Sequence, residues 1–114
     1  MFLGLRTVIY PASDLAAGKA WYEKLLGFPA YFDEPFYVGF NVGGYELGLI
    51  PDGGTTETYW GVANIQEAWS DMLAKGAIAK NEPKEVGGGI WVATFLDPHG
   101  NTVGIIENPH FKLP

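Results

Sequence analysis

Residues 3–27 read LGLRTVIYPASDLAAGKAWYEKLLG and contain the clearest secondary-structure signals of the chain. Residues 3–10 are rich in apolar and β-branched side chains, which is typical of a strand. Pro11 ends this strand because proline cannot donate a backbone hydrogen bond to a neighbouring strand. The polar pair Ser13-Asp14 can cap a helix, and good helix formers follow it. Gly27 then ends the helix, since glycine adopts the left-handed conformation freely. The stretch therefore predicts a strand followed directly by a helix.

Three short strands and two tight turns are expected next. Strand-like residues lie at 28–32, 36–42 and 45–50, with a turn at Asp33-Glu34-Pro35 between the first two. Gly43-Gly44 predicts a two-residue hairpin turn between the last two, because such turns need positive φ angles. The next segment, 51–56, reads PDGGTT, has the composition of a linker and marks the boundary between two halves.

The same order of elements recurs after this linker. We expect a strand at 58–63, a cap at Asn64 and a helix at 65–75 that Gly76 stops. Further strands are expected at 77–80, 90–96 and 102–107, with turns at Glu82-Pro83, Gly87-Gly88-Gly89 and residues 97–101. The two helix-ending glycines lie about 50 residues apart, which is consistent with a tandem repeat. The class is α+β, and the alternative is one irregular α+β sheet without internal symmetry.

Composition limits the function classes. The 114 residues fit a single domain, 1–114, with module one at 1–52 and module two at 57–110. There is no cysteine, so thiol catalysis, thiolate metal sites and disulfides are excluded. The net charge of −6 excludes nucleic acid and disfavours anionic membranes as partners, because both need basic surfaces. No apolar run approaches the roughly 20 residues of a membrane span, and we expect a cytoplasmic protein.

Two segments resemble the glyoxalase, bleomycin-resistance and extradiol dioxygenase proteins, the vicinal oxygen chelate superfamily. They are residues 10–28, which read YPASDLAAGKAWYEKLLGF, and residues 97–107, which read DPHGNTVGIIE. The segment 65–76 is similar to the second helix of that family. The resemblance implies tandem βαβββ modules, a curved mixed sheet that encloses a cleft, and a homodimer. It does not imply one activity, because the superfamily includes lyases, isomerases, thiol transferases, dioxygenases and drug-sequestering proteins.

The resemblance also implies four positions for metal ligands, one on each of four strands. These positions fall on Thr7, Glu46, a residue at or near Glu57, and Gly104. Threonine is a poor ligand for such a metal, and glycine has no donor atom. His99 lies in a turn and His110 follows Asn108-Pro109 in a tail, so neither supplies the missing imidazole. We therefore predict no metal and no cofactor, although Glu46 and Glu57 could anchor a hard cation such as Mg²⁺.

Strand parity predicts which side chains line the cleft. With Gly43-Gly44 as the turn, Phe40 pairs with Leu47 and packs on the helices, so that Gly39 and Gly48 pair on the opposite face. These two glycines either leave an open floor for a flat ligand or only let the sheet curl. The candidate ligand-binding residues on this reasoning and on the family register are Thr7, Ile9, Tyr37, Asn41, Glu46, Gly48, Tyr59, Trp91 and Gly104. Trp91 follows the triple glycine and is a candidate lid, cleft wall or dimer contact.

Three functions fit this cleft. The first is metal-free binding of a small aromatic or cationic molecule, as in drug sequestration, since aromatic residues and isolated carboxylates suit such a ligand. The second is a metal-assisted lyase, isomerase or dioxygenase. The third is a metal-independent enzyme with Glu46 as general base, oriented by the Asn41 amide and activated by desolvation. The simpler interpretation of Glu46 is a solvated side chain on an open sheet.

Overall fold

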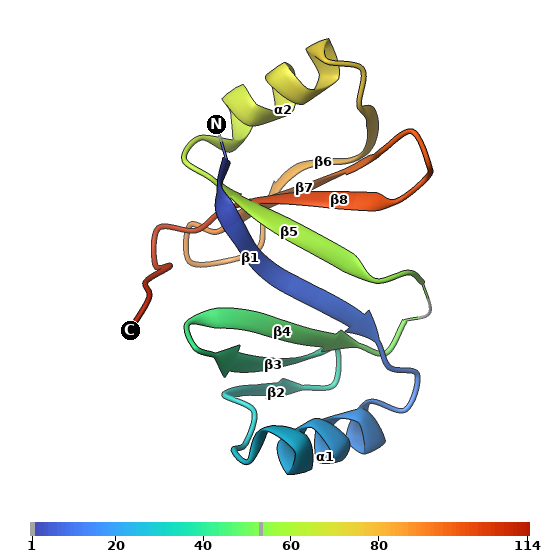
Figure 1. The fold of residues 1–114 in the computed structure, drawn as a ribbon, viewed down its shortest axis with the longest axis vertical. Coiled ribbons are helices and arrows are strands. Elements are labelled where there is room, and N and C mark those ends of the chain that lie inside the picture. The colour runs from blue at the N-terminus through green and yellow to red at the C-terminus, as the bar shows by residue number, and fades with distance from the viewer. Residues whose placement is uncertain (1, 53) are drawn as a thin grey trace. The chain divides into compact units, whose positions relative to one another are not determined.

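The structure is a computed structural model that describes residues 2–52 and 54–114. Its fold is α+β, and the chain divides into two compact units. We call residues 7–56 with 112–114 the amino-terminal unit, and residues 2–6 with 57–111 the carboxyl-terminal unit. In Figure 1 each helix lies against strands of its own unit.

The amino-terminal unit contains four strands and one helix. They are β1 (Phe2–Pro11, of which residues 7–11 belong here), α1 (Leu15–Leu26), β2 (Phe32–Glu34), β3 (Tyr37–Val42) and β4 (Tyr45–Ile50). The strand order is β2-β3-β4-β1, with β1 parallel to β4 and the other pairs antiparallel. The buried core consists of Val38, Phe40 and Leu49, against which Leu15, Tyr22 and Leu26 of α1 pack.

The carboxyl-terminal unit repeats this arrangement. Its elements are β5 (Glu57–Val62), α2 (Ile65–Ala74), β6 (Ile78–Glu85), β7 (Trp91–Leu96) and β8 (Thr102–Glu107), joined by residues 2–6 of β1. The strand order is β5-β8-β7-β6, and β5 is parallel to β8 as β1 is to β4. The core cluster contains Val62, Ile65, Ala68, Ala93, Phe95 and Ile105.

The local signals at the helix ends act as expected. Asp14 Oδ1 accepts a hydrogen bond from Ala17 N at 3.0 Å, and Gly27 has a φ of 85°. Asn64 Oδ1 accepts from Glu67 N at 3.0 Å. The repeated order of strand, helix and three strands is therefore confirmed, as is the α+β class.

Several element boundaries differ from the sequence-based expectation. The strand predicted at 28–32 is the short β2 at Phe32–Glu34, so Asp33 and Glu34 pair with β3 and do not form a turn. The strand predicted at 77–80 continues to Glu85, and irregular pairing with β7 accommodates Glu82-Pro83. Proline is tolerated there because β6 is the outer strand of its unit in the order given above.

Trp21 lies on α1 with 57% of its surface exposed, and it contacts Tyr22 edge-on. No helix among the described residues is long and apolar enough to cross a membrane.

The module boundaries 1–52 and 57–110 remain a prediction. The division into compact units assigns residues 2–6 to the carboxyl-terminal unit.

Candidate functional site

A carboxylate held by two tyrosines lies on the face of the amino-terminal unit's sheet that is opposite α1. Glu46, on β4, accepts a hydrogen bond from the Tyr31 hydroxyl at Oε1 and from the Tyr37 hydroxyl at Oε2, each at 2.5 Å. Tyr37 begins β3, and Tyr31 lies immediately before β2. Hydrogen bonds to a charged acceptor are stronger than neutral ones. The two hydroxyls therefore fix the orientation of both carboxylate oxygens.

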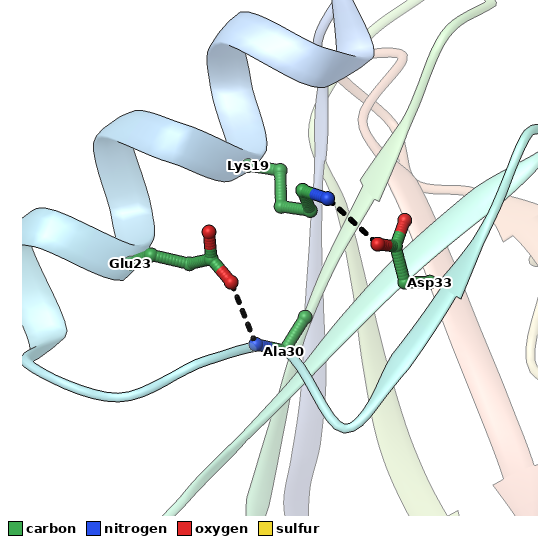
Figure 2. Close-up of polar contacts among 4 residues, drawn as sticks. All are labelled: Lys19, Glu23, Ala30 and Asp33. Atoms are coloured by element: carbon green, nitrogen blue, oxygen red, sulfur yellow. Dashed lines mark hydrogen bonds and ion pairs between the residues drawn. The ribbon is translucent and has the colours of Figure 1, made fainter.

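Polar contacts between α1 and the following segment place Tyr31 (Figure 2). Lys19 Nζ on α1 forms an ion pair with Asp33 Oδ2 at 2.7 Å, and Glu23 Oε2 accepts from Ala30 N at 3.3 Å. Tyr31 N itself donates to Gly39 O at 3.0 Å. The segment before β2 is thus attached to the helix on one side and to β3 on the other.

The glycines at the centre of this face do not form an open floor. Gly39 and Gly48 are opposite each other in the β3–β4 register, as strand parity predicts. The Tyr37 ring covers Gly48 so closely that a Cβ there would come within 2.7 Å of Tyr37 Cε1. A Cβ on Gly39 would lie 3.2 Å from both Glu46 Oε2 and Tyr31 Cε1. A ligand above these glycines would therefore meet tyrosine rings and a carboxylate, not bare backbone.

Two phenylalanines extend the tyrosine pair into an aromatic cluster, which we define as Tyr31, Phe32, Phe36 and Tyr37. The Phe32 ring centroid lies 6.4 Å from Tyr31, 6.1 Å from Phe36 and 5.9 Å from Tyr37. Tyr31 and Phe36 keep 62% and 67% of their surfaces exposed. Exposed aromatic surface next to a fixed carboxylate is unusual for structural packing and marks a candidate binding site.

The Tyr31 hydroxyl stays protonated over the ordinary pH range. Burial of the hydroxyl and, after it, the hydrogen bond to Glu46 raise the pKa of Tyr31. The phenol therefore acts as a donor to the carboxylate.

The remaining predicted residues of this unit lie on the same face. Thr7 is the register partner of Glu46 on β1, and Ile9 is the partner of Gly48. Asn41 is the partner of Glu46 on β3, but its Oδ1 accepts from Gly44 N at 2.8 Å and so supports the hairpin turn. The prediction that the Asn41 amide orients Glu46 is therefore wrong. The hydroxyls of Tyr31 and Tyr37 orient the two carboxylate oxygens instead.

Sequence reasoning did not assign Tyr31 to the site. The sequence predicts a strand at 28–32, whereas Tyr31 lies outside any strand, immediately before β2. The available signal was the run of aromatic residues at 31, 32, 36 and 37.

The other predicted residues lie in the carboxyl-terminal unit. Tyr59 donates to Glu57 Oε1 at 2.9 Å, and its ring covers Gly104, where a Cβ would lie 2.6 Å from Tyr59 Cε2. Burial and the nearby Glu57 raise the pKa of Tyr59.

Trp91 packs against the core cluster of the carboxyl-terminal unit. On the β7–β8 pair, Trp91 lies opposite Glu107 and Thr94 lies opposite Gly104. Trp91 and Thr94 are three residues apart on β7, so their side chains point to opposite faces of the sheet. Trp91 and Gly104 therefore face opposite sides of the sheet.

The residues at the metal-ligand positions implied by the resemblance do not fit a metal. Each Glu46 oxygen already accepts from a phenol, and Glu57 is bonded to Tyr59. Gly104 offers no donor, and the Tyr59 ring occupies the space that a side chain there would need. Within residues 2–52 and 54–114, no three His, Asp or Glu side chains gather as a metal site would require.

The two histidines have structural roles away from these carboxylates. His99 N donates to Asp97 Oδ1 at 2.8 Å in the turn before β8. His110 Nε2 lies 2.7 Å from Gly88 O, next to the triple-glycine turn. A shallow hollow on α2, lined by Gln66, Glu67, Ser70 and Asp71, contains none of the candidate residues.

The repeated strand–helix–three-strand units, each with the first strand parallel to the last, define a class of paired βαβββ proteins. Comparison with known protein families identifies which family of this class the chain belongs to. The chain belongs to the Glyoxalase/Bleomycin resistance protein/Dioxygenase superfamily, whose model matches residues 4–105. No curated protein matches the sequence significantly.

Solved structures of similar fold include several members of this superfamily. A methylmalonyl-CoA epimerase from Streptomyces coelicolor is 15% identical, with a TM-score of 0.75 and 100% of both chains covered. A superfamily member from Vibrio splendidus is 17% identical, with a TM-score of 0.70, covering 91% of this chain and 99% of that one. The Mn(II)-bound glyoxalase from Novosphingobium aromaticivorans is 18% identical, with a TM-score of 0.75, covering 93% of this chain but 39% of that one. At these identities the similarity establishes the fold alone.

Proposed function

We propose that the chain binds a small organic molecule, without a metal, at the aromatic cluster and Glu46 of the amino-terminal unit. The observation that carries this proposal is the Glu46 carboxylate, held by two tyrosine hydroxyls beside exposed aromatic rings. Aromatic rings supply a large apolar contact area with few rotatable bonds, and one fixed carboxylate supplies orientation.

The charge of the protein supports a neutral or cationic ligand over a phosphorylated one. The chain carries a net charge of −6, and an acidic surface attracts cations and repels phosphorylated compounds. The biological form of this function that we propose is sequestration of a drug-like compound; the superfamily name includes bleomycin-resistance proteins.

A second candidate is proton transfer with Glu46 as general base. It is favoured by the two hydroxyls, which hold both carboxylate oxygens in one orientation while each oxygen keeps a second lone pair. Enzymes of the same fold, such as the epimerase and the glyoxalase above, are consistent with this alternative. Under it, Glu46→Gln abolishes turnover of a bound substrate and leaves binding intact.

The proposal is tested by calorimetric titration of a panel of neutral and cationic aromatic compounds in buffer with EDTA. Phe36→Ala should weaken binding by about fivefold or more, since an exposed aromatic contact is worth about 1 kcal/mol. Leu25→Ala on α1 is the matched control, because Leu25 is 62% exposed and apolar but lies outside the cluster. If no compound binds, or if both variants weaken binding equally, the proposed site is wrong.

We also propose that the protein is a cytoplasmic homodimer. The support for the dimer is the presence of outer strands, β2 and β6, whose free edges can pair with another chain. Light scattering after size-exclusion chromatography tests it, and a single mass near 12.4 kDa at all concentrations would contradict it.

A further inference from the structure

The contacts of Glu46 restrict the kind of ligand further, given the proposed function. We propose that the site prefers a quaternary ammonium, a cation without N–H donors, over a neutral molecule of the same shape and over a primary ammonium.

The first argument is the uncompensated charge of Glu46. Among the described residues of the amino-terminal unit, no lysine, arginine or histidine nitrogen lies within 4.0 Å of this carboxylate. The nearby Lys19 is paired with Asp33. The hydroxyls of Tyr31 and Tyr37 orient the charge of Glu46 but carry no positive charge themselves. An organic cation therefore gains attraction at this face that its neutral isostere does not.

The second argument is hydrogen-bonding capacity. A primary ammonium has three donors, and each donor removed from water without a new acceptor costs free energy. Each oxygen of Glu46 already accepts one phenol, which leaves one lone pair on each oxygen and so fewer acceptors on the carboxylate than the three donors of a primary ammonium. A quaternary ammonium has no donors to satisfy and pays no such cost.

The third argument is the arrangement of the rings. Phe32 meets Tyr31, Phe36 and Tyr37 at interplanar angles of 58°, 66° and 63°. Rings tilted in this way do not stack flat on one another, and Tyr31, Phe32 and Phe36 all remain exposed. The negative faces of aromatic rings attract methylated ammonium groups, which is how aromatic cages recognise them.

The test compares three small ligands of defined charge in EDTA: choline, its neutral carbon isostere 3,3-dimethylbutan-1-ol, and ethanolamine. Proton NMR measures the affinity of each and the shift of the choline N-methyl signal. We expect choline to bind about tenfold or more tightly than either competitor, and its N-methyl signal to move upfield because ring faces shield it. Glu46→Gln should remove most of this preference for the cation.

The controls separate this inference from the proposed function. Phe36→Ala should reduce the upfield shift, whereas Leu25→Ala should not, and Phe36 is exposed enough that its removal leaves the fold intact. Equal affinities for choline and its neutral isostere would overturn the inference while leaving the proposed function standing. Failure of all three ligands, with a neutral aromatic compound from the larger panel binding in a Phe36-dependent way, would overturn it too. Failure of every compound in both experiments would overturn the proposed function itself.

Discussion

The ring of Tyr59 lies over Gly104, its register partner on β8, and the Tyr59 hydroxyl donates to Glu57 Oε1 at 2.9 Å. The amino-terminal unit has the same combination, because the ring of Tyr37 covers Gly48 and its hydroxyl donates to Glu46. Neither glycine has a positive φ. The space required by a tyrosine ring, and not the backbone conformation, therefore explains both glycines.

Alanine at either covered glycine should destabilise the fold. A Cβ would come within 2.6 Å of Tyr59 Cε2 at Gly104 and within 2.7 Å of Tyr37 Cε1 at Gly48. Overpacking of this kind costs about 1–3 kcal/mol. Urea unfolding should show this loss for Gly104→Ala and Gly48→Ala. Gly54→Ala is the control, since nothing lies within 4 Å of its Cβ position, and equal stabilities of all three variants would contradict the assignment.

Two tyrosine hydroxyls with raised pKa values should make the protein sensitive to alkali. The pKa values of Tyr31 and Tyr59 are raised in the folded state above the value of about 10 expected when unfolded. Their contribution to stability is therefore complete below about pH 10 and is lost as the pH rises toward their folded pKa values. Tyr59→Phe should flatten the fall in unfolding free energy above pH 10. A pH dependence identical to the wild type would show that Tyr59 titrates normally.

Metal removal should change neither stability nor ligand binding. The ligand positions implied by the family hold tyrosine-bonded carboxylates and a glycine under a ring. Elemental analysis after growth with added manganese, nickel and zinc should find well under one ion per chain. Stoichiometric metal that is lost in Glu46→Ala would refute this account of the site.

Glu107 should act as a helix cap and not as a reactive group. Its Oε1 accepts from Ile65 N, the first residue of α2, at 2.9 Å. Acceptors at helix amino termini contribute about 0.5–2 kcal/mol. We expect Glu107→Ala to lower the unfolding free energy by about 1 kcal/mol, whereas Glu107→Gln, which keeps an acceptor, should cost less. Equal losses in the two variants would argue for a role of the charge alone.

The sequence predicted those features that depend on neighbouring residues. Asp14, Asn64 and Gly27 define helix ends through contacts within one turn, and Gly43-Gly44 sets the β3–β4 register. These signals were enough to predict the fold class and the repeated order of elements.

The features that depend on distant residues were not predictable in the same way. Tyr31 reaches Glu46 only because α1 and β3 hold its segment, and sequence spacing contains no sign of those contacts. Trp91 follows three glycines, and the sequence predicted a lid, a cleft wall or a dimer contact there. Its position on β7 instead directs its side chain toward the core of its unit. The outcome at both positions depends on tertiary packing.

Spectra of the aromatic side chains show directly whether a bound molecule contacts the aromatic cluster. Carbon–proton NMR spectra of the aromatic rings should be recorded during titration with the tightest ligand of the panel, with EDTA present. We predict that the signals of Tyr31, Phe32, Phe36 and Tyr37 move at saturation while the buried Tyr59 ring stays unchanged. Shifts confined to Tyr59 and its neighbours, with the four cluster rings unaffected, would contradict the account.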